Sequence, residues 1–556
     1  MSTEPKNHGR AYAALVAAGI LITRVFGFAR ESVFAYFLGS TAPADAFKAA
    51  LRIPNFLQNL LGEGVLSASL IPVYAKLIAE KDEETAGRVA GTIFSLLLVV
   101  VGVLVLAGVL LAGPLVDLIT FGFEGARRDM TVTLTRILFP GVGFLVLSAW
   151  CLGILNSHRM FFLSYVAPTL VNVAMIATLV FFGSRLAGFP LATALAWGTI
   201  VGMFLQFAIQ VPFVYRLAPD LHYGLSVALE PVREVIRNFV PVVVGRGVVQ
   251  VSAFIDMAIV SLLAEGTFAT LGYAQTIYLL PVSLFGMSVA ASELPQMSSL
   301  ADASDEAREK LRTRLHAGLR QIAFFIAPSA MAFFFIGDVL VAAIYERGRF
   351  STGDTRMVWY ILITIALGLL AVTFSRLLSS TYYAIRDTRT PLRYAVIRIV
   401  VSAALAWLLA VPLRPLIVAF FEAARIPIPN VENARNALGL IGIALGSTIG
   451  SWVEYFLLKR TLRARIGTFS EEPSFLLKLW GSAAIAGIIA LFAGRPVAAW
   501  AESLVTTRLG LDHVAGGFAA ALIFGVTYFL LTAIMKIPEA GRILRRIPLI
   551  GRWSRR

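Results

Sequence analysis

The chain has 556 residues, of which 58% are hydrophobic and only 15% are charged, and its mean hydropathy is +0.79. A soluble protein would carry about 25% charged residues, so this composition excludes a soluble enzyme or binding domain. The net charge of +15 would suit a nucleic-acid partner, but the basic residues lie in short segments between apolar runs. That placement indicates a membrane protein and no nucleic-acid partner.

Fourteen runs are candidates for membrane-spanning helices, each of which needs about 20 mostly apolar residues. The runs lie at roughly 11–38, 43–75, 89–116, 130–155, 161–183, 189–214, 238–263, 268–300, 317–344, 357–385, 392–412, 437–458, 475–494 and 514–535. The sequence therefore predicts an all-α polytopic membrane protein with about 14 transmembrane helices. The first run has no convincing signal-peptide cleavage site and is predicted to stay in the protein.

Basic residues concentrate in alternate connecting segments and in the C-terminal tail, whereas the intervening segments hold few. Because basic loops stay on the cytoplasmic side, this asymmetry predicts that both termini are cytoplasmic. Arg127 and Arg128 are assigned to an outside loop in this topology.

The first two runs hold an unusual set of ionisable residues. Arg24, Arg30 and Glu31 lie in the first run, and the second holds Asp45, Lys48, Arg52 and Glu63. Each charge at the bilayer centre costs about 2.5–3.5 kcal/mol, so such residues usually face a polar interior. We expect the first two helices to line a cavity that handles a charged molecule, although some of these side chains could instead snorkel to the interface.

Arginine predominates among the remaining cations within the runs, which are Arg136, Arg246, Arg376 and Arg398. Its planar fork suits phosphate or pyrophosphate. The intramembrane carboxylates are taken to be Glu31, Asp45, Glu63 and Asp256. A static network of arginines and carboxylates that only holds helices together is the open alternative.

An internal repeat is visible at an offset of 222–223 residues. Ala68-Ser69-x-x-Pro72 recurs as Ala291-Ser292-x-x-Pro295, and Arg24 corresponds to Arg246. We predict two pseudo-symmetric six-helix lobes with a substrate site between them near the membrane midplane. The predicted domains are an N-lobe (1–215), a cytoplasmic linker (216–237), a C-lobe (238–465) and a segment with the last two spans and the basic tail (466–556).

No enzymatic motif is present, and no phosphate-binding loop indicates an ATP motor. The lone cysteine, Cys151, excludes an intramolecular disulfide, and the five histidines form no metal-ligand pair. The chain is therefore predicted not to be an enzyme and to use no cofactor, and no metal site is assigned.

Several motifs resemble the signatures of the MurJ/MviN family, which flips lipid II in peptidoglycan synthesis. They are Thr23-Arg24-Val25-Phe26-Gly27-Phe28-Ala29-Arg30-Glu31, Asp45-Ala46-Phe47, Pro54-Asn55-Phe56-Leu57, Gly62-Glu63-Gly64, Ala167-Pro168-Thr169-Leu170-x-Asn172 and Arg386-Asp387-x-x-Thr390-Pro391. The resemblance implies two six-helix lobes that alternate access in the bacterial inner membrane, with a groove for a lipid tail in the last two helices. The implied partners are lipid II or a related polyprenyl-pyrophosphate lipid, membrane lipids and the cell-wall synthesis machinery.

The resemblance also implies a cationic cavity with Arg24, Arg30, Asp45 and Glu63 among its functional residues, and Glu31 belongs to the same motif. The family usually has arginines where this chain has Asn59 and Thr276. We hypothesise that Arg52, or Arg246 in the seventh span, supplies the missing charge.

Some members of the family bind sodium between the seventh and eleventh helices, and Asp256 matches their carboxylate. Ser402 is a weak oxygen ligand, and Arg398 is close by in the sequence. We expect Arg398 to pair with Asp256 in place of the metal.

Two other functions stay open at this stage. The fold could export another polyprenyl-linked glycan or work as a cation-coupled antiporter. A non-transporting paralogue that scaffolds the cell-wall machinery is a third possibility.

Overall fold

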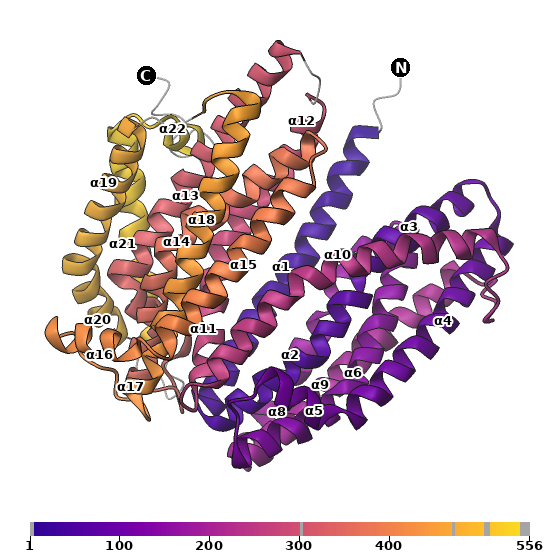
Figure 1. Ribbon diagram of the computed structural model, residues 1–556, viewed down its shortest axis with the longest axis horizontal. Coiled ribbons are helices and arrows are strands. Elements are labelled where there is room, and N and C mark those ends of the chain that lie inside the picture. The colour runs from indigo at the N-terminus through magenta and orange to yellow at the C-terminus, as the bar shows by residue number, and fades with distance from the viewer. Residues whose placement is uncertain (1–4, 301–303, 470–472, 505–511, 545–556) are drawn as a thin grey trace. The chain divides into compact units, whose positions relative to one another are not determined.

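The computed structural model describes residues 5–300, 304–469, 473–504 and 512–544, and these residues form helices without any β-strand (Figure 1). Within this described part, 12 helices are long and apolar enough to cross a membrane. The 34-residue α1 (Pro5–Leu38) and the 32-residue α10 (Glu230–Ser261) occupy the predicted first and seventh spans. The prediction of an all-α membrane protein with about 14 spanning helices is therefore confirmed.

The chain forms two compact units, Met1–Ala269 and Thr270–Arg556. Besides α1 and α10, the helices of the first unit are α2 (Ala42–Leu61), α3 (Glu63–Ala79), α4 (Glu83–Leu110), α5 (Ala112–Ile119), α6 (Gly125–Ser157), α7 (Phe161–Val166), α8 (Thr169–Phe182) and α9 (Gly188–Leu217). Helix α10 packs on α2 and α3 within the first compact unit, and the predicted lobe bounds stay a prediction.

Helix α6 is the centre of the first unit, where it packs against α2, α3, α4 and α9. Its side chains Val146, Trp150 and Ile154 are buried in one apolar core. The Trp150 indole donates a hydrogen bond to the Ala90 carbonyl oxygen at 3.0 Å, which satisfies its only polar atom. A helix surrounded by others is apolar on most sides, as α6 is.

The second unit contains α11 (Thr267–Pro281, from Thr270 onward), η1 (Val282–Met287), α12 (Ser288–Ser298), α13 (Asp305–Tyr345), α14 (Thr352–Ala384), α15 (Arg389–Ala410), α16 (Arg414–Ala423), α17 (Ala434–Ala437), α18 (Gly439–Ile466), α19 (Pro473–Ile489), η2 (Ala490–Gly494), α20 (Arg495–Leu504), α21 (Asp512–Ile534) and α22 (Pro538–Leu544). The last spans, α19 to α21, pack on α13. There the Tyr528 hydroxyl donates to the Phe324 carbonyl oxygen at 2.6 Å. The last two spans, which lie outside the predicted repeat, therefore belong to the second compact unit.

Two interruptions of the helices lie at corresponding positions of the predicted repeat. The second span is broken at Gly62, between α2 and α3, and its counterpart is interrupted by the π-helix η1 around residue 285. A Cβ atom on Gly62 would lie 2.4 Å from the Gln58 carbonyl oxygen, so only glycine fits this break. The Gly62-Glu63-Gly64 motif thus marks a discontinuous helix, a feature that transporters place beside their binding sites.

The turns that close α6 and α14 are also equivalent. Arg159 and Arg386 both adopt positive φ, at 63° and 61°, and each backbone N–H bonds to a carbonyl three residues back. After the second of these turns, Asp387 accepts hydrogen bonds from the N–H groups of Arg389 and Thr390, both at 3.0 Å. Asp387 therefore caps α15.

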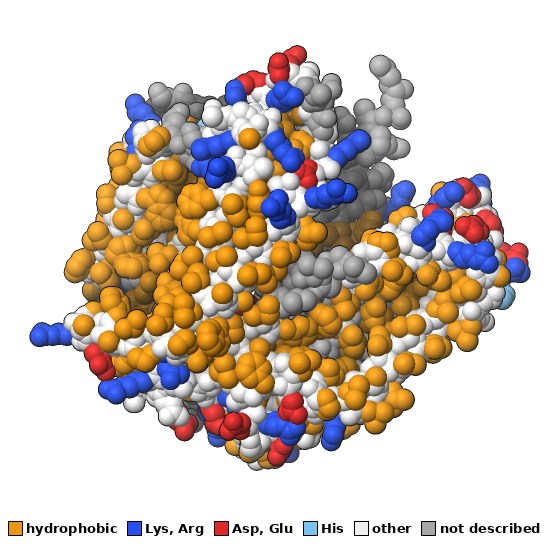
Figure 2. All heavy atoms as spheres, viewed as in Figure 1, with side chains coloured by type: hydrophobic (Ala, Val, Ile, Leu, Met, Phe, Trp, Pro, Cys, Tyr) orange, Lys and Arg blue, Asp and Glu red, His pale blue; other side chains and the backbone are white. Residues whose placement is uncertain are grey.

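Hydrophobic side chains cover the helices visible in Figure 2, and charged side chains gather near helix ends. This distribution is the one that a bilayer imposes, because polar backbone groups are satisfied within each helix and only apolar side chains face lipid.

We predict that Asp387→Asn destabilises the protein by about 1 kcal/mol near neutral pH, the usual contribution of a helix cap. Partial desolvation opposes the shift, but hydrogen bonds from Thr390 and Arg465 still lower the pKa of Asp387 from 3.8 to about 2. The stabilisation is complete above the unfolded value and is lost as the pH falls toward 2. Thermal unfolding of purified protein at pH 6 and pH 3 should show a smaller difference between the wild type and Asp387→Asn at pH 3. A difference that does not change with pH would contradict this assignment.

Candidate functional site

The charged residues predicted in the first two spans lie on α1 and α2. Glu31 is the junction between the two helices, because Arg30 donates to its Oε1 at 2.7 Å and Lys48 donates to its Oε2 at 3.0 Å. The Lys48 and Glu31 side chains are only 12% and 15% exposed, so this pair is poorly screened by solvent. The Lys48 ammonium also lies 5.0 Å from the centre of the Phe34 ring.

Arg52 connects this group to the end of α10. Its guanidinium lies 5.3 Å from the centre of the Phe268 ring and within electrostatic reach of both Asp256 and Glu31. We call Arg30, Glu31, Lys48, Arg52 and Asp256 the cationic cluster, because its three cations exceed its two carboxylates. A partly buried surplus of positive charge, with two guanidinium forks, is suited to bind a phosphate or pyrophosphate.

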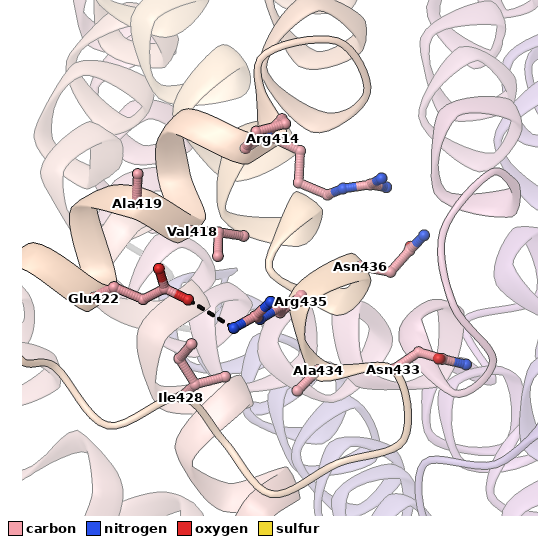
Figure 3. Close-up of a pocket in the computed structure, with 10 residues that line it drawn as sticks. Arg414, Val418, Ala419, Glu422, Ile428, Asn433, Ala434, Arg435 and Asn436 are labelled. Carbon is pink, nitrogen blue, oxygen red and sulfur yellow. Dashed lines mark hydrogen bonds and ion pairs between the residues drawn. The ribbon is translucent and has the colours of Figure 1, made fainter.

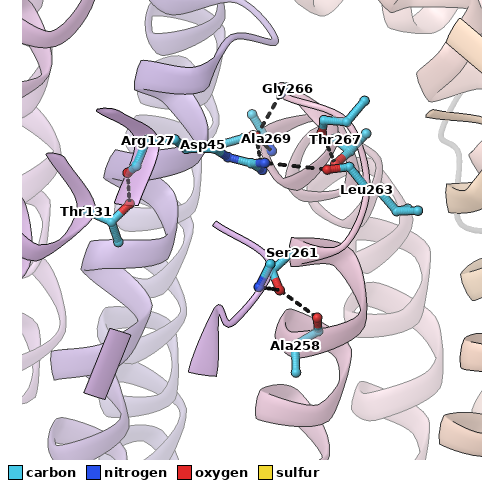
Figure 4. Close-up of polar contacts among 11 residues, drawn as sticks. Asp45, Arg127, Thr131, Ala258, Ser261, Leu263, Gly266, Thr267 and Ala269 are labelled. Carbon is cyan, nitrogen blue, oxygen red and sulfur yellow. Dashed lines mark hydrogen bonds and ion pairs between the residues drawn. The ribbon is translucent and has the colours of Figure 1, made fainter. Parts of the chain in front are cut away.

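Asp45 has a different environment from the predicted cavity wall. It is completely buried and accepts a hydrogen bond from Arg127 at 2.5 Å (Figure 4). Its two oxygens also accept from the backbone N–H groups of Gly266 and Ala269, both at 2.7 Å. The carboxylate therefore joins α2, α6 and the turn that follows α10, and we call this arrangement the Asp45 lock.

The prediction that Arg127 lies in a loop was wrong. The residue is in the first turn of α6 and is 5% exposed. Its guanidinium lies 3.6 Å from the centre of the Phe123 ring and donates to the Leu263 carbonyl oxygen at 3.5 Å. Nearby, the Gly122 N–H donates to the Ser261 hydroxyl at 3.1 Å, so a second contact holds the same turn (Figure 4).

The other predicted cavity residues of the first unit are less enclosed. Arg24 and Asn59 are exposed on α1 and α2. Glu63 begins α3 and Arg246 lies on α10, but their side chains are outside the described part of the structure. The structure therefore brings Arg30, Glu31, Arg52 and Asp256 together and places Asp45 in the separate lock.

In the second unit, Arg398 forms an ion pair with Glu454 of α18 at 3.0 Å. Glu454 is 13% exposed and lies within a spanning helix. The prediction that the intramembrane carboxylates are only Glu31, Asp45, Glu63 and Asp256 was therefore wrong. The pairing of Arg398 with Asp256 stays a prediction. Ser402 is buried and packs directly on Gly450, while the Thr276 hydroxyl donates to Gly272 of its own helix at 3.0 Å.

A polar pocket of about 730 Å³ lies in the long connection before α18, between α16 and α17 (Figure 3). It contains an ion pair between Arg435 and Glu422 at 2.9 Å. Arg435 is 76% exposed, so this pair contributes little to stability. The pocket holds none of the predicted site residues.

A family model described as "Lipid II flippase MurJ" matches residues 34–424. The chain belongs to the MurJ lipid II flippase family. It is 30% identical over 552 residues to the "Probable lipid II flippase MurJ" of Rhizobium tropici, covering 96% of this chain and 95% of that relative. It is 30% identical over 483 residues to the "Lipid II flippase MurJ" of Burkholderia cenocepacia, covering 85% and 88%.

Solved structures agree on the fold. One described as "Lipid II flippase MurJ, inward closed conformation" has a TM-score of 0.70 at 21% identity, covering 94% of this chain and 99% of that one. An inward-facing multidrug resistance transporter of the MATE family in the MOP superfamily has a TM-score of 0.61 at 17% identity, covering 82% and 98%. This chain is therefore a MurJ-family transporter and not an enzyme.

Within the MurJ fold, sequence reasoning missed Arg127 and Glu454, and it counted Lys48 among the charges of the second span without listing it as a site residue. Lys48 was visible as a charge in a span, and its place one turn before Arg52 on α2 was the available signal. Arg127 gave no such signal, because it stands beside Arg128 and Asp129 in a segment that reads as a polar loop.

We predict that Asp45→Ala destabilises the protein by ~3–5 kcal/mol, because it leaves the Arg127 charge buried without its carboxylate. The double variant Asp45→Ala/Arg127→Ala should regain part of that loss. Thermal unfolding of the four proteins of this double-mutant cycle measures the coupling.

The control is the neighbouring exposed pair Arg128 and Asp117, whose side chains are 38% and 49% exposed. Breaking it with Asp117→Ala should cost at most about 1 kcal/mol. Equal effects of the two aspartate substitutions would refute the lock.

Proposed function

We propose that this protein moves lipid II from the inner to the outer leaflet of the bacterial cytoplasmic membrane by alternating access. Membership of the MurJ family over residues 34–424 carries the proposal. The cationic cluster supports it, because a pyrophosphate is the strongly charged part of this substrate and Arg30, Lys48 and Arg52 provide a partly buried positive surplus.

In this mechanism, Arg24, Arg30 and Arg52 bind the pyrophosphate oxygens. Glu31 serves as an internal counter-ion, since its single negative charge is shared between Arg30 and Lys48. When the pyrophosphate binds, the two cations exchange Glu31 for phosphate oxygens. When it leaves, they return to Glu31, which lowers the cost of holding two partly buried cations.

The positive-inside distribution supports a topology with both termini cytoplasmic. With that topology α4 runs outward, so α5 lies in the outer half of the bilayer. The membrane potential is a suitable energy source, since it acts at about 2.3 kcal/mol per charge per 100 mV. We also propose that the protein delivers its substrate to the cell-wall synthesis machinery.

A bacterium depleted of its own lipid II flippase tests the function. We expect wild-type protein to restore growth and Arg24→Ala to fail, with Arg88→Ala as a matched control because Arg88 is 51% exposed and pairs with Glu84 on the surface. Failure of a well-inserted wild type would favour another polyprenyl-pyrophosphate glycan, an antiporter or a scaffold. Rescue by Arg24→Ala would argue against transport through this site.

A second prediction concerns the neutral positions. Arg52→Ala should lower the rate of lipid II transport in proteoliposomes by about tenfold or more, the effect of losing a hydrogen bond to a charged group. Asn59 lies two turns from Arg52 on the same face of α2, so Asn59→Arg should restore much of the rate in the Arg52→Ala background. Normal transport by Arg52→Ala would remove Arg52 from the mechanism.

A further inference from the structure

An apolar groove of about 560 Å³ lies within the first unit, beside the cationic cluster. It is formed by α2, α4, α5, α6 and α10, and every residue that lines it is apolar. Its volume is within the range of sites that hold small-molecule ligands or parts of larger ones. None of the residues assigned to the transport site lines it.

The groove arises from small residues and a change in chain direction. Helix α4 ends at Leu110 and α5 begins at Ala112, so the chain turns at Leu111, which lines the groove. Ala107 and Ala258 leave space where larger side chains would fill it. The Phe139 ring occupies the room above Gly108, where an added Cβ would lie only 2.0 Å from the ring.

Aromatic rings form part of the wall. Phe56 of α2 and Phe254 of α10 meet edge to face, with their ring centres 4.7 Å apart. Within a bilayer an apolar chain gains no hydrophobic free energy by leaving lipid, so selection depends on van der Waals packing. Rigid rings favour a methyl-branched chain of fixed shape over a flexible straight chain, because less conformational freedom is lost on binding.

The neighbouring charges indicate which chain the groove holds. Arg52 lies one turn before Phe56 on the same face of α2, and Asp256 directly follows the lining residue Ile255 on α10. The cationic cluster and the groove therefore adjoin each other. An amphiphile with a strongly anionic head and an apolar chain matches both.

We propose that this groove binds the polyisoprenoid chain of the substrate after its head group has crossed the membrane. The inference rests on the proposed function and topology, which place α5 and the adjacent groove in the outer half of the bilayer. The groove is distinct from the tail site implied for the last two spans, which belong to the second unit. The pyrophosphate stays near Arg52 while the chain enters along Phe56 and Phe254.

The test uses the full-length protein in liposomes with two photoreactive probes, undecaprenyl pyrophosphate with a diazirine on its chain and a straight-chain phosphatidylglycerol with the same group. We expect the isoprenoid probe to label residues 104–119 and 254–258 in the wild type. Ala107→Trp, which fills the groove, should reduce this labelling about tenfold, the effect of losing ~1.4 kcal/mol of binding. Leu106→Trp is the matched control, since Leu106 is 61% exposed and does not line the groove.

Equal labelling of Ala107→Trp and wild type would overturn the proposal, as would equal labelling of the wild-type groove by the phosphatidylglycerol probe. The growth-rescue experiment separates this result from the function. If wild type fails to rescue growth but the isoprenoid probe still labels the groove selectively, the groove stands and the cargo is another polyisoprenoid lipid.

Discussion

The cost of holding charge inside an apolar helix bundle determines how the first unit is built. Burying an unpaired ion in this environment would cost several kcal/mol. The carboxylates of Asp45 and Glu31 each accept hydrogen bonds from more than one donor. Asp45 uses one guanidinium and two backbone N–H groups, and Glu31 uses Arg30 and Lys48. Because the donors come from different helices, neutralising the charge also fixes α1 to α2 and α2 to α6.

The spanning helices could be predicted from hydropathy because a bilayer permits few alternatives. Backbone groups in lipid must be satisfied within a segment, so a long apolar run has to be a helix. The same physics made Arg30, Glu31 and Arg52 visible as site residues, since an ionisable residue in such a run is rarely accidental. The repeat was also visible in the sequence, because Ala68-Ser69-x-x-Pro72 recurs as Ala291-Ser292-x-x-Pro295.

Partner choice could not be predicted, because hydropathy has no information about which helices meet. Asp45 was identified as important, but the sequence alone could not show that it is completely buried against Arg127 and the turn at Gly266. Glu454, which pairs with Arg398, was likewise not recognised as an intramembrane carboxylate. The predicted lobe bounds stay a prediction, and within the first compact unit α10 packs on α2 and α3.

The neutral residues Asn59 and Thr276 are consistent with the cost of holding charge inside the helix bundle, because they keep the number of cations within the spans small. Every added cation raises the cost of the empty site, whereas a transporter must release its cargo as well as bind it. A cluster in which Glu31 pairs with both Arg30 and Lys48 costs less to keep without cargo, and it can still offer those cations to a pyrophosphate by exchange. Arg52 lies against the Phe268 ring and within electrostatic reach of Asp256. As the third cation of the cluster it leaves a net positive charge, which favours the dianionic head group over the single charge of Glu31. On this view, the number of arginines matters less than how much more strongly the same cations bind the pyrophosphate than they bind Glu31.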